Sequence, residues 1–223
     1  MNEGYNRCIR HWDEVFSRET AGVPTAPETG NDGLDEALKW LCSDSETVLD
    51  FGCGNAAMLF YCALFGTKRH IGIDLCKKAI ENAKRRAAKM QAGEYELLTG
   101  GVERLGEIPP DSADAVILSN IIDNLFPADA QKLAMECRRI LKPGGKALIK
   151  LNPHITHEQM QQWGVRVIEG DLLDDGLLLL NRTTEQWRTF FEQYFGIERY
   201  TEIWYPQHEQ TNRLFWVRRE RLR

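Results

Sequence analysis

Hydrophobic residues in the middle of the chain follow two alternating patterns: short apolar runs, and longer segments whose apolar positions recur every three or four residues. Short runs are typical of strands buried on both faces of a sheet, and the longer spacing is typical of amphipathic helices. The predicted strands and helices alternate along the chain: strands at 47–51, 70–75, 95–100, 114–120 and after the Pro-Gly-Gly turn at 143–145, and helices at 56–65, 77–91 and 128–141. Because such alternation builds βαβ units, the pattern predicts an α/β, doubly wound fold with a mostly parallel sheet.

The N-terminal segment predicts a helix outside this series. Five apolar residues recur there at helical spacing: Tyr5, Ile9, Trp12, Val15 and Phe16. A loop with two prolines follows at 20–32, and a second helix is predicted at 34–42. We therefore expect residues 1–43 to form an N-terminal helical lid and residues 44–223 to form the main domain.

The pattern changes after Leu151. An extended segment at 175–182 is expected between two helices, at 157–164 and 183–195. Two strands follow, at 197–205 and 212–219, and only six residues separate them. So short a connection predicts an antiparallel hairpin, which we place at one edge of a seven-stranded sheet.

Composition narrows the possible partners and the location. The net charge of -5 and the pI near 5.6 leave no extended basic surface, and the six basic residues within 77–89 are interpreted as the solvated face of a helix. Six cysteines are scattered without zinc-ligand spacing, so no metal site is expected. The chain has no run of ~18 apolar residues and no signal-peptide core. These features predict a soluble, cytoplasmic protein that binds neither nucleic acid nor membranes.

The stretch VLDFGCGNA, residues 48–56, joins the first strand to the next helix. Gly52 and Gly54 would let a ligand approach the backbone N–H groups of the helix N-terminus. Asp74 ends the second strand, where a carboxylate can bind ribose hydroxyls. The glycine spacing alone also fits a dinucleotide, but Asp50 would repel a pyrophosphate and attract an ammonium group. The sequence therefore predicts an adenosine ligand with a cationic, amino-acid-like tail, which is the form of S-adenosylmethionine (SAM).

Four motifs in this order resemble those of class I SAM-dependent methyltransferases. VLDFGCGNA is similar to the family's D-x-G-x-G motif, and GIDL to its ribose-binding motif. DAVILSN resembles its fourth-strand motif, and RRILKPGGKALI its helix-turn-strand into the fifth strand. The resemblance covers about residues 44–151. It implies SAM as the cofactor, S-adenosylhomocysteine (SAH) as the product and a methyl acceptor as the partner, which we take to be a small molecule.

The resemblance also implies a set of cofactor contacts. Asp50 would meet the methionine amino group, Asp74 the ribose and Leu75 the adenine. The full set is Asp50, Gly52, Cys53, Gly54, Asp74, Leu75, Val102, Glu103, Ser119 and Asn120. Helix capping is the alternative role for Asp74 and Asn120. Gly101 stands where the family has an aspartate for the adenine amine, so either another group binds the amine or it faces water.

Residues for the acceptor and for catalysis are harder to assign, because methyl transfer needs mainly alignment and, for some acceptors, a base. The predicted bases are His154 and Asp123, for which local hydrogen bonding and helix capping are the alternatives. Tyr5 and His11 are expected to cover the site together with Trp12, whose alternative role is a core anchor. Tyr5, His11 and Tyr194 are further candidate proton acceptors. Residues 154–182 lie where the family inserts elements that cover the substrate.

Three other functions remain as alternatives. An NAD-dependent oxidoreductase would share the sheet, but Asp50 and the LKPGG turn argue against it. A nucleic-acid methyltransferase is disfavoured by the acidic charge and by SNII in place of an N/D-P-P-Y/F motif after the fourth strand. A non-catalytic regulator that binds SAM would be distinguished from a methyltransferase by a closed pocket for the methyl acceptor.

Overall fold

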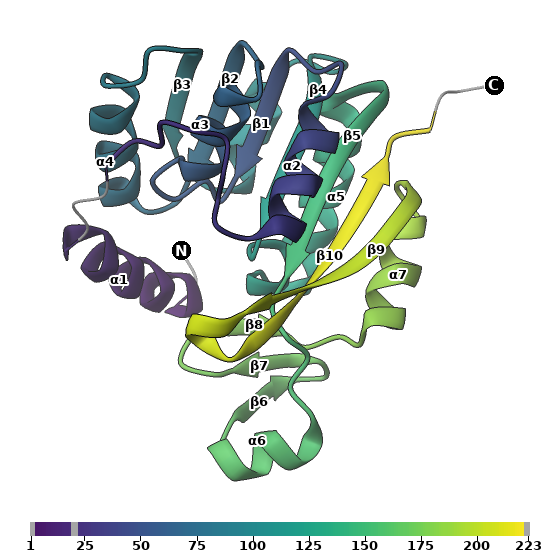
Figure 1. Ribbon diagram of the computed structural model, residues 1–223. Helices are drawn as coiled ribbons and strands as arrows, with labels where there is room; N and C mark the ends of the chain where they lie inside the picture. Colours follow the sequence, from purple (N-terminus) through teal and green to yellow (C-terminus); the bar gives the residue numbers. More distant parts are fainter. Residues whose placement is uncertain (1–2, 19–21, 221–223) are drawn as a thin grey trace.

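A seven-stranded sheet forms the centre of the protein (Figure 1). The computed structural model describes residues 3–18 and 22–220. The strand order is β3-β2-β1-β4-β5-β10-β9, with β10 antiparallel to both neighbours and the other pairs parallel. The strands are β1 (Thr47–Phe51), β2 (Arg69–Asp74), β3 (Glu94–Thr99), β4 (Ala113–Ser119), β5 (Leu141–Leu151), β9 (Gly196–Tyr205) and β10 (Gln210–Arg218). The predicted α/β fold and its antiparallel edge hairpin are confirmed.

Helices cover both faces of the sheet, as parallel strands require. One face carries α2 (Asp32–Cys42), α3 (Ala57–Leu64) and α4 (Lys77–Ala87). The other carries the short helices η1 (Val102–Glu107) and η2 (Ile122–Asn124) and the helices α5 (Pro127–Ile140) and α7 (Thr184–Glu192).

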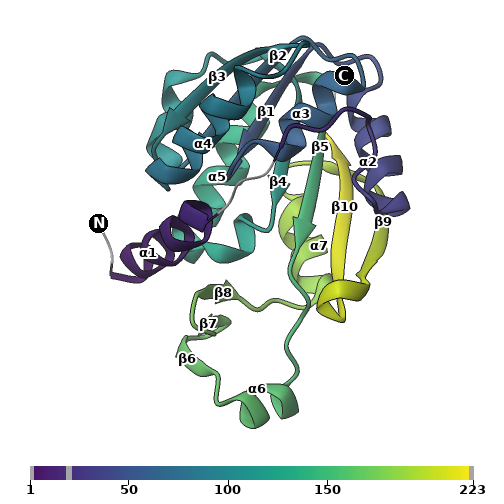
Figure 2. The same cartoon turned by 60° about the vertical axis from the view of Figure 1, so that its left-hand side comes forward.

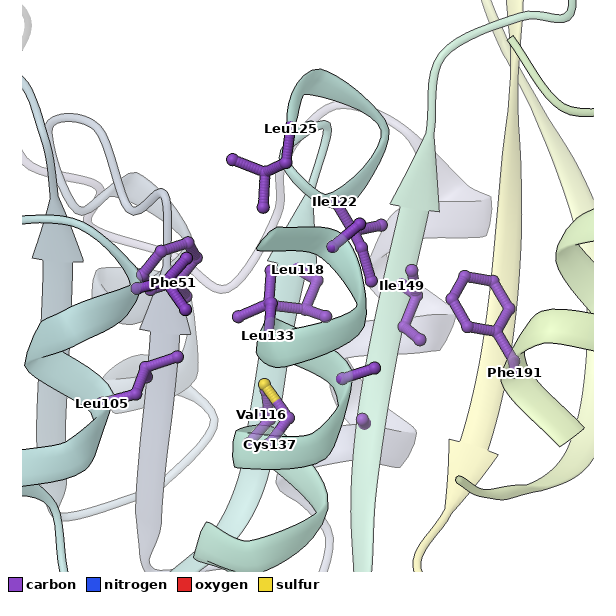
Figure 3. Packing of buried hydrophobic residues seen from close by; sticks show 14 of the residues in the cluster. Phe51, Leu105, Val116, Leu118, Ile122, Leu125, Leu133, Cys137, Ile149 and Phe191 are labelled. Carbon is purple, nitrogen blue, oxygen red and sulfur yellow. The ribbon is translucent and has the colours of Figure 1, made fainter. Parts of the chain in front are cut away.

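The apolar core on the second face joins the central strands to α5 and α7. Figure 3 shows Leu133 of α5 beside the central strands and Phe191 of α7 beside β5 and β10. Both side chains are fully buried, and burying a side chain of this size contributes about 1.5–3 kcal/mol. The core therefore holds β1 and β4 side by side up to their carboxyl ends. The strand order reverses between these two strands.

The Pro-Gly-Gly segment differs from the expected turn. It is part of β5, and the pairing of β4 with β5 shifts register there, from Ala113 opposite Leu141 to Ala115 opposite Lys146. The chain just after β10 holds the segment in place: Gly144 N donates to Arg219 O and Arg219 N donates to Gly145 O. These bonds connect the irregular start of β5 to the chain just after β10. The two strands of the edge hairpin, β9 and β10, are joined by η3 (Pro206–His208).

A small unit is inserted between β5 and α7. It consists of α6 (His157–Trp163) and an antiparallel sheet of β6 (Arg166–Glu169), β7 (Leu172–Asp174) and β8 (Leu178–Leu180). The predicted extended segment at 175–182 therefore contains only the short strand β8. Figures 1 and 2 both place this unit below the carboxyl ends of the main strands.

Helix α1 (Glu3–Arg18) lies on the same side of the sheet as this small unit (Figure 1). Its C-terminal end contacts α4 through Phe16 and Asn82, and its N-terminal end lies against Leu178 of β8 at Gly4, so it crosses the carboxyl ends of the strands. No helix in the ranges 3–18 and 22–220 is long and apolar enough to span a membrane.

Candidate active site

A cavity of about 520 Å³ lies between α1 and the carboxyl ends of β1, β2 and β4. This is where the strand order reverses and where open α/β sheets bind ligands. The sheet side is lined by Phe51, Gly52, Gly54, Asp74, Leu75, Ser119 and Asn120. The roof is formed by Tyr5, Cys8, Ile9, Trp12 and Phe16 of α1.

The glycine loop forms the floor of this cavity. Gly52 has φ +76°, and a Cβ there would lie 2.6 Å from Ile121 Cγ1, so both backbone conformation and space require glycine. Gly54 has φ +52°, and a Cβ there would lie 3.0 Å from Phe16 Cζ of α1. Ala56, the residue just before α3, also has a positive φ, of +64°.

Cys53 differs from its two glycine neighbours because it does not line the cavity. Its side chain is buried in the core below α3, and its Sγ would be 2.8 Å from a Cβ on Gly72. Burial raises the pKa of this thiol, so it is a poor nucleophile. Cys53 can contribute only its backbone to a ligand.

Asp74 holds the loop while it also lines the cavity. Its Oδ2 accepts from Gly54 N at 2.8 Å, and its Oδ1 accepts from Cys76 N at 2.7 Å. Burial raises the pKa of this carboxyl, and the two N–H donors oppose that rise. Each oxygen keeps a lone pair for a further donor, such as a ribose hydroxyl.

Asp50 is a buried carboxylate whose Oδ1 has no hydrogen-bond partner among the residues that the structure describes. It is 1% exposed, and it lies behind the cavity wall formed by Phe51 and Gly52. Burial raises its pKa to about 8, the charge of Asp74 adds to this, and the ammonium of Lys150 opposes it. Lys150 is itself desolvated, which lowers its pKa to about 8. A ligand that donates a charged hydrogen bond would offset the cost of burying Asp50.

The end of β4 contributes Ser119 and Asn120. Asn120 has φ +53°, a conformation uncommon outside glycine, which costs of order 1 kcal/mol. Two hydrogen bonds hold it there: its Nδ2 donates to Asn152 Oδ1 at 2.6 Å and its backbone N donates to Lys150 O at 2.8 Å. The side chain is therefore held by Asn152, just after β5, and the backbone by Lys150 of β5.

Neither predicted base is brought to the cavity wall. Asp123 is fully buried, and its Oδ2 accepts from Asn152 N at 2.7 Å. Burial raises its pKa to about 6, although its hydrogen bonds and the charge of Arg213 oppose the rise. His154 lies outside the cavity lining, as does Tyr194, and burial lowers the pKa of His154. A catalytic role for these residues stays a prediction.

The acceptor side of the cavity contains residues that the sequence reasoning did not select. Tyr5 O–H donates to Asp129 Oδ2 at 2.5 Å and accepts from Phe126 N at 3.2 Å. Asp129 and Lys132, one turn apart on α5, both line the cavity. The unselected lining residues are Cys8, Ile9, Phe16, Phe51, Cys76, Gly100, Ile121, Asn124, Leu125, Asp129, Lys132 and Leu177. For those on α5, the only sequence signal was their position in the helix after the fourth strand.

The predicted lid residues of α1 lie in different settings. Tyr5 and Trp12 line the cavity, whereas His11 is exposed and does not. Trp12 is 43% exposed, so it is not a core anchor. Contacts on both sides hold the helix: Phe16 O accepts from Asn82 Nδ2 at 2.6 Å, and Arg7 pairs with Asp174 at 2.8 Å.

Comparison with known proteins agrees with this geometry. Residues 49–149 match the family model described as a methyltransferase domain. Residues 49–149 therefore form a methyltransferase domain. The match begins one residue before Asp50 and ends one residue before Lys150, so it includes the glycine loop and Asp74. The match agrees with SAM, predicted above from Asp50 and the glycines, as the methyl donor.

Relatives and solved structures support the same domain at lower similarity. Ribosomal protein L11 methyltransferase of Vibrio cholerae serotype O1 is 28% identical over 114 residues, which are 49% of this chain and 35% of the relative. The chain thus spans about a third of the length of the curated relatives it matches first.

Two solved methyltransferases share the fold across nearly the whole chain. N-methyltransferase NodS of Bradyrhizobium japonicum WM9, in complex with SAH, has a TM-score of 0.64 at 15% identity and covers 93% of this chain and 98% of its own. The 1,6-didemethyltoxoflavin-N1-methyltransferase of Burkholderia thailandensis has a TM-score of 0.65 at 13% identity. The alignment covers 99% of this chain and 92% of that protein's chain. At these identities the likeness establishes the fold alone.

Proposed function

We propose that this chain transfers a methyl group from SAM to a small-molecule acceptor bound beneath α1. The observation that carries the proposal is that one cavity of about 520 Å³ is lined both by the predicted cofactor contacts and by α1 and α5. Phe16 lies over Gly54 at one end of α1, and Tyr5 contacts Asp129 of α5 at the other. The helix therefore spans the cavity from the glycine loop to the proposed acceptor side.

The cofactor contacts support SAM more than a dinucleotide. Asp50 Oδ1 has no donor within the described part of the protein and the side chain is 1% exposed, which suits an ammonium group and disfavours a pyrophosphate. Asp74 keeps acceptor capacity for a ribose. Gly52 and Gly54 leave room for close approach of the ligand to the loop.

The roof supports a small acceptor. Tyr5, Cys8 and Trp12 cover the cavity, and its volume lies within the ~300–1,000 Å³ typical of small-ligand pockets. A protein acceptor, as the name of the L11 methyltransferase implies for that relative, would have to reach the methyl group past α1. We therefore place an acceptor with an apolar body between α1 and Leu125, with its polar group toward Asp129.

The reaction requires little of the protein beyond alignment. When bound, SAM would supply a methyl group attached to a sulfonium sulfur, and that sulfur leaves as the neutral thioether of SAH. Asn120, held by its hydrogen bonds to Lys150 and Asn152, would position the acceptor side of the methionine portion. The apolar residues of α1 exclude water. Asp129 is a carboxylate on the cavity wall that can hold a proton released by the acceptor, whereas His154 and Asp123 could act only through a rearrangement or an intervening group.

The test begins with binding. SAH at about one hundred times its Kd should stabilise the protein by about 2.7 kcal/mol, seen as a higher Tm, and NAD should not. Asp74→Ala should abolish the SAH effect. Stabilisation by NAD and not by SAH would overturn the choice of cofactor.

Turnover is then measured as SAH formed from SAM in the presence of a cell extract divided by dialysis. The dialysable fraction should support SAH formation, and the macromolecular fraction should not. Activity only with macromolecules would contradict a small acceptor. Tight SAM binding without turnover in either fraction would instead favour a non-catalytic regulator.

A further inference from the structure

Gly101 lacks the carboxylate that binds the adenine amine in related methyltransferases, but another carboxylate occupies the same space. A Cβ built on Gly101 would lie 2.8 Å from Glu103 Oε2 and 3.6 Å from Leu75 Cδ1. A side chain at position 101 would therefore point to where Glu103 already places its charge. We propose that Glu103 binds the exocyclic amine of adenine and makes the cavity selective for that base. The proposal rests on SAM being the ligand of the proposed function.

The Glu103 side chain is held in this position from within its own loop. Its Oε1 accepts from Gly101 N at 2.8 Å, which folds the carboxylate back across the start of η1. The adjacent Arg104 does not neutralise it, because Arg104 Nη1 contacts Glu107 at 2.8 and 2.9 Å and its Nε donates to Thr99 O. Within the described residues, Glu103 forms no ion pair. Oε2 is thus available to a ligand donor, and Glu103 lines the cavity.

The neighbouring backbone completes the recognition of the base. Val102 begins η1, and the first N–H of a helix has no partner inside the helix. A backbone donor at Val102 next to an acceptor at Glu103 matches adenine, whose ring nitrogen accepts and whose amine donates. Hypoxanthine has the reverse pattern, a ring N–H and a carbonyl. Its carbonyl would face the carboxylate of Glu103, which has no proton to donate.

Gly101 and Glu103 therefore work as a pair. Glycine at 101 leaves the space empty, and the acid two residues later fills it. An acid at both positions would bring two carboxylates close together unless the flexible end of Glu103 turned away, so an aspartate at 101 competes with Glu103 for this place. This explains why the loss of the aspartate need not leave the amine in water.

The experiment measures the Kd of SAH and of its hypoxanthine analogue by calorimetry. Wild type should bind SAH about tenfold or more tightly than the analogue, since a hydrogen bond to a charged group is at stake. Glu103→Ala should weaken SAH binding by about tenfold and remove most of the preference. Glu103→Gln should bind the analogue better, relative to SAH, than Glu103→Ala does, because the glutamine amide can donate a hydrogen bond to the hypoxanthine carbonyl. Glu96→Ala is the matched control, because this exposed glutamate of β3 lies outside the cavity lining and its loss removes the same charge, so neither Kd should change.

A double variant separates this role from general damage to the loop. Gly101→Asp alone should weaken SAH binding, whereas Gly101→Asp combined with Glu103→Ala should restore both affinity and preference for adenine. If Glu103→Ala keeps the wild-type ratio of the two Kd values, or if the double variant is no better than Glu103→Ala, the proposal is wrong. If wild type binds neither compound, the proposed function itself fails.

Discussion

Replacing Asp50 with asparagine should stabilise the unliganded protein at neutral pH and weaken its binding of SAH. The carboxyl is buried, its Oδ1 is unpartnered, and burial raises its pKa from 3.8 to about 8. Because the folded pKa lies above the ordinary value, its contribution to stability is complete below about pH 4 and is lost as the pH rises to about 8. A pH of about 7 lies about three units above the ordinary pKa of this carboxyl. At about 1.4 kcal/mol per unit, the raised pKa therefore lowers the free energy of unfolding by about 4 kcal/mol at that pH.

Asparagine removes this cost but leaves an unpaired amide, worth about 1–3 kcal/mol, so a net gain of about 1–3 kcal/mol remains. Urea unfolding of both proteins at several pH values checks this. Between about pH 5 and pH 7, wild type should lose about 2–3 kcal/mol relative to Asp50→Asn. Calorimetry should show SAH bound about tenfold or more weakly by the variant. Parallel stability curves would refute the raised pKa of Asp50, and an unchanged Kd would refute its contact with the amino group.

Three further predictions follow from single contacts. Gly54→Ala should weaken SAH binding by about tenfold, because its Cβ would meet Phe16 and displace α1. Gly66→Ala is the control, since Gly66 also has a positive φ but has open space around it. It should share the backbone cost of about 1 kcal/mol and keep its affinity for SAH. Equal affinities would exclude the contact with α1. Burial lowers the pKa of His70 from 6.5 to about 4, so the unfolded chain binds the proton first and stability should fall by about 2–3 kcal/mol between about pH 6.5 and pH 4. His70→Gln should flatten that part of the urea-unfolding profile, and an unaltered slope would assign it to other groups. With a pKa of about 6, Asp123 as a base requires the rate to fall below about pH 6, and this limb should vanish in Asp123→Asn. A surviving limb would leave Asp123 a purely structural role.

The local pattern of the sequence was sufficient for the order and type of the main elements. Most observed boundaries lie within two residues of those expected, although α4 ends at Ala87 and not at residue 91. The hydrophobic periods of strands and helices are local properties, and so are the left-handed conformations that Gly52 and Gly54 adopt. The carboxylates Asp50 and Asp74 at strand ends followed from the same pattern. The three-stranded unit did not, because strands as short as β7 and β8 have too few residues to show a period.

What the tertiary structure decided is how the cavity is closed and which charges face it. Tyr5 meets Asp129 across 124 positions of sequence, and no local pattern encodes such a contact. The two predicted bases lie near the right strands, yet side-chain direction and packing turn Asp123 into the interior. Sequence alone therefore determined the framework and the cofactor loop, because backbone preference and hydrophobic period act over a few residues. The roof, the acceptor side and the place of Glu103 depend on which side chains meet when distant segments pack.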